Sequence, residues 1–161
     1  MNAIEPTAEA CTACEMTRSN YVPYQYVISL RIWHPVISHE AISETLGRQP
    51  KFCWTVGTPR LSPKGTPLGG LRELTYWSAE LIGETATSEL IEVEQALAQE
   101  LDKLEPVTGL FARIRNEGGK VELFVGLFSE TNVVIDLEPS LMARLSGYGL
   151  GICLNYYPWA R

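Results

Sequence analysis

The chain contains 161 residues, of which 45% are hydrophobic and 20% are charged, as is ordinary for one globular domain with a sizeable core. It has no apolar run near the roughly 18 residues that a membrane-spanning helix needs, and its first residues lack the basic and apolar regions of a signal peptide. We therefore expect a cytoplasmic protein without a membrane segment. The net charge of −6 argues against general binding of nucleic acid, which needs a basic surface.

The charges are unevenly distributed along the chain. Five cations and no acid occur from Arg48 to Arg72, whereas eight acids and only Lys103 occur from Glu80 to Glu105. One interpretation is a domain with two faces of opposite sign. The other is a solvated loop followed by the wet face of a helix.

The first predicted element is a strand. Residues 1–20 show no periodicity and are expected to form a flexible tail, followed by a single α+β domain over residues 21–161. In the stretch YQYVISLRIW the residues alternate as in a half-buried strand, with one face formed by Tyr24, Tyr26, Ile28, Leu30 and Ile32. A short helix is predicted in SHEAISETLG, with Ser38 as its N-cap and Gly47 after its end. Its inner face is expected to consist of Ala41, Ile42, Thr45 and Leu46.

Two further strands, KFCWTVG and ELTYWSAELI, are joined by a long connection over residues 57–72. This connection is rich in Gly and Pro, yet it lacks the Lys-Ser/Thr pair of a phosphate-binding loop. It is longer than an ordinary hairpin loop, and long loops are either functional or mobile. It is therefore predicted to be a plain connector or a partner-binding loop that carries Arg60, Lys64 and Arg72.

The clearest helix is TSELIEVEQALAQELDKLEP. Apolar residues recur in it at steps of three and four and form a stripe that is expected to pack on the sheet: Leu90, Val93, Leu97, Leu101 and Leu104. Glu94 and Glu100 belong to its acidic, solvent-facing side. The next stretch, VTGLFARIRNEGG, is predicted to be a helix that turns at Gly118–Gly119.

The rest of the chain is predicted to form strand, strand, helix and strand, in KVELFVGLFS, NVVIDL, EPSLMARLSGYG and LGICLNYY. The helix has an inner face of Leu141, Met142 and Leu145. Short links between strands favour an antiparallel or mixed sheet. The expected fold is a two-layer α+β sandwich with helices on one face of the sheet, ferredoxin-like in its layers.

Patterns for catalysis or metal binding are weak. Cys11 and Cys14 form a C-x-x-C pair, but there is no second pair and the only histidines are His34 and His39, so we expect no metal and no cofactor. Both histidines are expected to be surface or turn residues. No nucleophile motif occurs, and Glu122 is expected at the surface, so no catalytic residue is assigned.

The aromatic residues of the strands suggest a binding surface. Neighbours on a strand point to opposite sides, so Tyr76 and Trp77 cannot share a face, nor can Tyr156 and Tyr157. Some aromatic side chains must therefore lie on the sheet face away from the helices. That face would be a protein-binding or ligand-stacking surface, a homodimer interface, or a surface covered by the N-terminal tail. The residues that we assign to partner binding are Trp54, Arg60, Lys64, Arg72, Trp77, Glu94 and Tyr157.

In its order of features the chain resembles a bacterial family known as domain of unknown function 4279. The resemblance rests on YVISLRI, AISETLGRQP, VGTPR, YWSAEL, LDKLEP, GGKVELFVGLF and LMARLSGYGLGICLNYYP, from about Tyr24 to Pro158. It implies no activity and no catalytic residue. We expect a non-enzymatic module that binds a protein partner, such as an immunity protein that neutralises a bacterial toxin. The alternative is a small sensor or enzyme whose site, between the open sheet face and residues 57–72, takes an anionic molecule.

Overall fold

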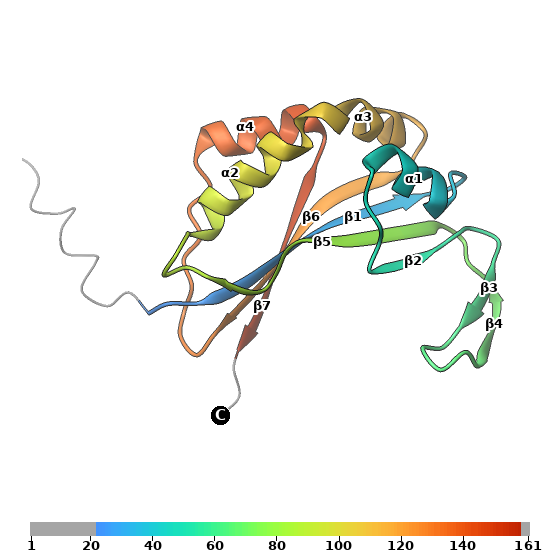
Figure 1. Ribbon diagram of the computed structural model, residues 1–161, viewed down its shortest axis with the longest axis horizontal. Helices are drawn as coiled ribbons and strands as arrows, with labels where there is room; N and C mark the ends of the chain where they lie inside the picture. The colour runs from blue at the N-terminus through green and yellow to red at the C-terminus, as the bar shows by residue number, and fades with distance from the viewer. Residues whose placement is uncertain (1–21, 159–161) are drawn as a thin grey trace, which may run out of the picture.

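A computed structural model describes residues 22–158 of the chain, in which helices cover one face of a five-stranded sheet (Figure 1). The order is β1 (Gln25–His34), α1 (His39–Leu46), β2 (Phe52–Trp54), β3 (Pro59–Leu61), β4 (Pro67–Leu71), β5 (Thr75–Thr87), α2 (Val93–Leu104), the short helix η1 (Glu105–Val107), α3 (Thr108–Asn116), β6 (Lys120–Ser129), α4 (Pro139–Tyr148) and β7 (Gly151–Pro158). The predictions for residues 1–20, including Cys11 and Cys14, lie outside the described residues. No helix in the described part of the chain is long and apolar enough to cross a membrane.

The strands of the main sheet are arranged in the order β2-β5-β1-β6-β7. β1 pairs antiparallel with both β5 and β6, whereas β7 runs parallel to β6 and is reached through α4. A mixed sheet under one layer of helices confirms the predicted two-layer α+β sandwich. The resemblance to a ferredoxin-like sandwich lies in its two layers, a sheet and one layer of helices.

The core lies between the sheet and the helices. On β1 the apolar side chains alternate as predicted, and Tyr26, Ile28, Leu30 and Ile32 are all buried. The pairing places Leu30 opposite both Ala79 of β5 and Leu123 of β6, so the helix-facing sides of three strands form one apolar surface. Buried helix residues complete the core: Ile42, Val93, Ala96, Leu97, Leu101, Phe111, Ile114, Leu141 and Leu145.

Helix α1 begins and ends where its sequence indicates. The Oγ of Ser38 accepts a hydrogen bond from the N–H of Ala41 at 3.3 Å, and Gly47 has the left-handed φ of 60° that favours glycine at a helix end. The inner face is narrower than predicted: Ile42 is buried, whereas Ala41 and Thr45 are exposed.

Helix α2 starts later than predicted, at Val93. Leu90 lies in a turn before the helix and is 84% exposed, so its place in the predicted stripe was wrong. The other four residues of the stripe, from Val93 to Leu104, are buried as predicted. Glu100 was assigned to the wet side, but it is 2% exposed and forms an ion pair with Lys103, one turn away.

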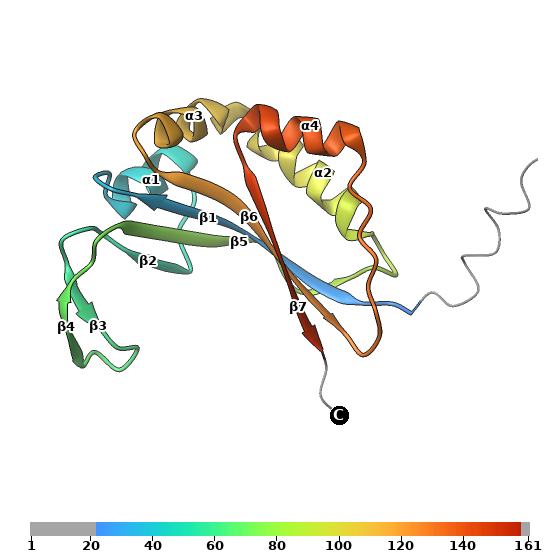
Figure 2. The same ribbon diagram turned by 180° about the vertical axis from the view of Figure 1, so that it is seen from behind.

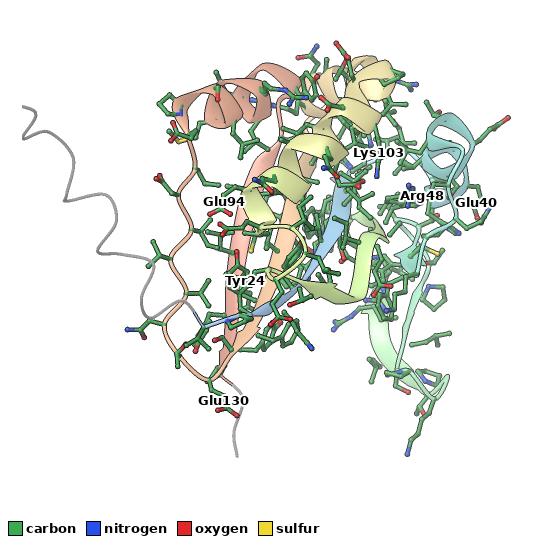
Figure 3. The ribbon with its side chains drawn as sticks, turned by 60° about the vertical axis from the view of Figure 1, so that its left-hand side comes forward. Tyr24, Glu40, Arg48, Glu94, Lys103 and Glu130 are labelled. Atoms are coloured by element: carbon green, nitrogen blue, oxygen red, sulfur yellow. The ribbon has the colours of Figure 1, made fainter. Side chains whose placement is uncertain are left out.

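The stretch NVVIDL is not a strand, although its residues alternate. It runs as extended chain beside α2, with Val133, Ile135 and Leu137 against the core and Val134 exposed. The N–H of Asp136 donates to Oε1 of Glu94 at 2.8 Å, which ties this segment to the helix (Figure 3). The alternating pattern of this segment therefore reflects the burial of one of its sides, although the segment pairs with no strand. In α4, Met142 is exposed, whereas Leu141 and Leu145 are buried as predicted.

Residues 57–72 form a hairpin of their own. Strands β3 and β4 pair antiparallel as a separate two-stranded sheet, which projects from the β2 end of the main sheet on the side away from the helices (Figures 1 and 2). At its base, Gly57 N–H donates to the carbonyl of Arg72, and Arg72 N–H donates to the carbonyl of Thr58. The connection predicted from the sequence is thus a folded β-hairpin.

Candidate functional site

The sheet face opposite the helices, called the open face below, carries a row of aromatic residues at one end of the strands. The register places Trp54 of β2 opposite Tyr76 of β5, and Tyr76 opposite Trp33 of β1. Because paired residues point to the same side of a sheet, the three rings form one row. Their centroids are 4.6 Å apart for Trp54 and Tyr76, and 5.2 Å apart for Trp33 and Tyr76.

Cations lie over the rings of the open face. The guanidinium of Arg72 is 4.1 Å from the centroid of the Trp54 ring, and the ammonium of Lys120 is 5.0 Å from the Trp33 ring. Further along the strands, Arg31 lies 3.5 Å from the ring of Phe124. Such cation–π contacts hold flat rings and positive charge together at one surface.

A hollow of about 360 Å³ opens beside the aromatic row, at the base of the β3–β4 hairpin. Its lining includes Trp33, Trp54, Arg60 and Arg72. The Nε of Arg72 is buried and has no hydrogen-bond partner in the described part of the chain. An N–H donor in that condition is suited to an acceptor supplied by a bound molecule.

The other end of the open face is also aromatic. The rings of Phe128 on β6 and Tyr157 on β7 stack with centroids 5.0 Å apart, and the Tyr157 hydroxyl accepts a hydrogen bond from Asn155 at 2.6 Å. Tyr157 is 40% exposed.

The structure separates the residues that we assigned to partner binding. Trp54, Arg60 and Arg72 come together at the hollow, Lys64 lies on the hairpin between β3 and β4, and Tyr157 lies at the far end of the open face. Trp77 and Glu94 lie elsewhere: burial of Trp77 opposes its assignment, whereas the assignment of the half-buried Glu94 stays a prediction. Trp77 is fully buried on the helix side, where its indole N–H donates to Ser43 Oγ at 2.9 Å. Glu94 belongs to the helix layer, facing the 131–138 segment (Figure 3).

Residues 24–159 match the family described as Domain of unknown function (DUF4279). The chain belongs to this family. No curated protein and no solved structure matches it. The DUF4279 match includes every strand of the open face and the β3–β4 hairpin, so the candidate site lies within the shared part of the family.

Six residues of the open face were not assigned from the sequence: Arg31, Trp33, Tyr76, Lys120, Phe124 and Phe128. They lie on the side of their strands opposite the apolar, helix-facing side, and the alternating pattern was the available signal. The alternating pattern does not tell which residues of two neighbouring strands lie opposite each other. Lys120 meets Trp33 only because β1 and β6 pair antiparallel with these residues opposite each other.

This site of the DUF4279 chain offers little support for metal binding or nucleophilic catalysis. In the described residues no three His, Cys, Asp or Glu side chains come together as a metal site requires. Cys53 is paired with Trp77 and so lies on the side of β2 away from the aromatic row, and partial desolvation raises the pKa of its thiol, which disfavours the thiolate that a nucleophile needs.

Besides Glu100, two titratable residues are buried against our expectation. Glu122 was expected at the surface, but it is 5% exposed and forms ion pairs with Arg31 and Lys120. His34 was expected in an exposed turn, but it is buried, and its Nδ1 accepts the N–H groups of Val36 and Ile37 at 3.0 and 2.8 Å. Glu122 therefore pairs with two cations of the open face, Arg31 and Lys120, and His34 has a structural role in starting the turn to α1.

Proposed function

We propose that this chain is a non-enzymatic binding module and that its open face contacts an acidic surface of a partner protein. The observation that carries the proposal is the row Trp54–Tyr76–Trp33, flanked by Arg60, Arg72 and Lys120, on the one sheet face that no helix covers. Trp, Tyr and Arg are the residues most often found at the centre of protein–protein interfaces.

The surroundings of the row support contact with a protein. Exposed apolar residues extend from the row onto β2 and the hairpin: Phe52, Leu61, Leu68, Leu71 and Leu74. Leu71 and Leu74 line the hollow beside the row, next to Arg60 and Arg72, and exposed apolar side chains beside cations are typical of a docking surface. Arg60 and Arg72 make no ion pair with any carboxylate that the structure describes, so their charge is available to a partner.

The partner that we propose is a bacterial toxin, with this chain acting in the cytoplasm as its immunity protein by covering the toxin's functional surface. An occluding module needs area and charge complementarity, and it needs no catalytic group. The surplus of aromatic residues on the open face supports this form of the proposal.

The test is calorimetric titration of the chain with the purified protein products of the genes that neighbour its own. Arg60→Ala and Trp54→Ala should each weaken binding by about 30-fold or more, the effect of losing about 2 kcal/mol at a central contact. Arg144→Ala is the matched control, because Arg144 lies in the helix layer and pairs with Asp102. Unchanged binding by the first two variants, or no binding by the wild type, would remove the proposal.

A second function is favoured by one observation, the hollow beside the aromatic row. Its volume of about 360 Å³ lies within the range of small-molecule sites, and Arg60 and Arg72 would pair with an anion there. A thermal-shift screen with nucleotides and acidic metabolites tests it. A true ligand at 100 times its Kd should stabilise the fold by about 2.7 kcal/mol, and Arg60→Ala should abolish the effect.

A further inference from the structure

Three hollows lie end to end around one end of the sheet. The first is the hollow beside the aromatic row, and the second, of about 330 Å³, shares Trp33 and Leu74 with it. The third, of about 510 Å³, lies between α3, α4 and the start of β7, and shares Gly119 and Lys120 with the second. Because neighbours share lining residues, the three hollows are adjacent, and the path that they line from the hairpin to the β7 edge is called the groove below.

The lining of this groove is basic, although the chain as a whole has a net charge of −6. Among the described residues, four cations line it, Arg60, Arg72, Lys120 and Arg115, against one acid, Glu73. Lys120 pairs with Glu122, whereas the three arginines have no carboxylate partner in the described chain. The charge of the groove is therefore complementary to an acidic ligand.

The two ends of the groove differ in character. The hairpin end is aromatic, with Trp33 and Trp54, whereas the β7 end is aliphatic, with Met142, Leu145 and Ile152. Gly149 opens the β7 end to Arg115, because a Cβ at position 149 would lie 2.7 Å from Arg115 Nη1. An arginine thus stands directly beside an apolar hollow, and the pair fits an acidic residue next to an apolar one.

The length of the groove suits a short extended peptide. It passes from β2 to β7, across four strand spacings of about 4.8 Å, or about 19 Å in total. An extended chain advances about 3.3 Å per residue, so about six residues would span it.

We propose that the groove binds an extended acidic segment of the partner protein, with an apolar side chain of that segment in the β7-end hollow. This inference rests on the proposed function and names the part of the partner that is recognised. A single-stranded nucleic acid would also meet cations and rings, but the aliphatic end offers it nothing to stack on, and the net charge opposes it.

The experiment is a selection of random twelve-residue peptides on the whole chain, followed by fluorescence anisotropy of the enriched peptides. We expect enrichment of Asp and Glu together with one Leu, Ile, Met or Phe at a fixed spacing. Arg115→Ala and Met142→Glu should each weaken binding about tenfold or more. The matched controls, Arg113→Ala on the same helix and Ala143→Glu beside Met142, should bind as the wild type does, since neither residue lines the groove.

Three results would overturn the inference: no acidic consensus, selected peptides that bind Arg115→Ala and Met142→Glu unchanged, or tighter binding of an oligothymidine than of any selected peptide. The proposed binding of a partner protein by the open face can be tested separately from the binding of an extended segment in the groove. If Arg60→Ala and Trp54→Ala abolish binding of the protein partner while Arg115→Ala and Met142→Glu leave it unchanged, the open face binds the partner without an extended segment.

Discussion

His34 is the residue through which this fold should respond to pH. Burial lowers the pKa of His34 below its ordinary value of 6.5, and the nearby Glu117 carboxylate opposes the shift only in part. Protonation is also opposed by hydrogen bonding, because Nδ1 of His34 accepts two backbone N–H groups and cannot accept them when it is protonated. The neutral ring is therefore the one that the fold requires.

The free energy of unfolding should consequently fall as pH falls below about 6.5, because His34 then binds a proton in the unfolded chain but stays neutral in the folded chain. Arg113 lowers the pKa of Glu117, so the Glu117 carboxylate loses its stabilising charge only at still lower pH. In His34→Asn the side-chain oxygen can accept the same N–H groups without titrating. Urea unfolding from pH 7 to 5 should show a flatter dependence for this variant than for the wild type and for His39→Asn. Equal slopes for all three proteins would show that His34 does not set the dependence.

Two glycines provide a test of close packing at single positions. A Cβ at Gly119 would lie 2.6 Å from the Trp33 carbonyl oxygen and 2.6 Å from Ile114 Cγ2, whereas at Gly147 it would meet nothing within 4 Å. Gly119→Ala should therefore cost about 1–3 kcal/mol, and Gly147→Ala, inside α4, should gain about 0.5 kcal/mol. Thermal unfolding decides the signs. A neutral Gly119→Ala would mean that β6 and α3 are not held as closely as described.

At the scale of elements, α2 buries an apolar stripe in the core. Leu97 is fully buried at its centre, so Leu97→Ala should cost about 2–5 kcal/mol. Leu90, which the spacing had placed on the same stripe, lies before the helix and is exposed, so Leu90→Ala should stay within about 0.5 kcal/mol. Chemical denaturation of the two variants measures this difference. Similar losses would place Leu90 in the core and the start of the helix at an earlier residue.

The elements that local signals define were predictable, and the pairings between them were not. Ser38 and Gly47 mark the ends of α1 because caps act within one turn. The stretch NVVIDL shows the limit, since alternation reports burial on one side but carries no information about a partner strand. For the site, the run of cations pointed to Arg60 and Arg72. The dipeptide Tyr76–Trp77 showed that one ring faces outward but not which, because that choice depends on where α1 packs.

Across the whole molecule, charge is unevenly distributed, although each layer carries both signs. The acidic segment from Glu80 to Glu105 contributes α2 to the helix layer, whereas Arg60, Arg72 and Lys120 lie at the open face. An acidic partner should be attracted to the basic groove, and its association rate should fall as added salt shortens the Debye length from about 30 Å at 0.01 M to about 3 Å at 1 M. Stopped-flow association measures it. A rate that rises with salt would mean that the net charge of −6 dominates and that the basic groove does not guide the encounter.

The most direct test of the binding surface uses the indole N–H groups as reporters. Trp33 and Trp54 lie on the open face, while Trp77 is buried under α1, so the three indoles report on opposite sides of one sheet. The measurement is a titration of the ¹⁵N-labelled chain with an acidic peptide from the selection, followed by two-dimensional NMR. Binding at the open face predicts that the Trp33 and Trp54 indole signals shift while the Trp77 signal and the α2 amides stay in place. Shifts confined to Trp77 and α2, with Trp33 and Trp54 unmoved, would contradict the account.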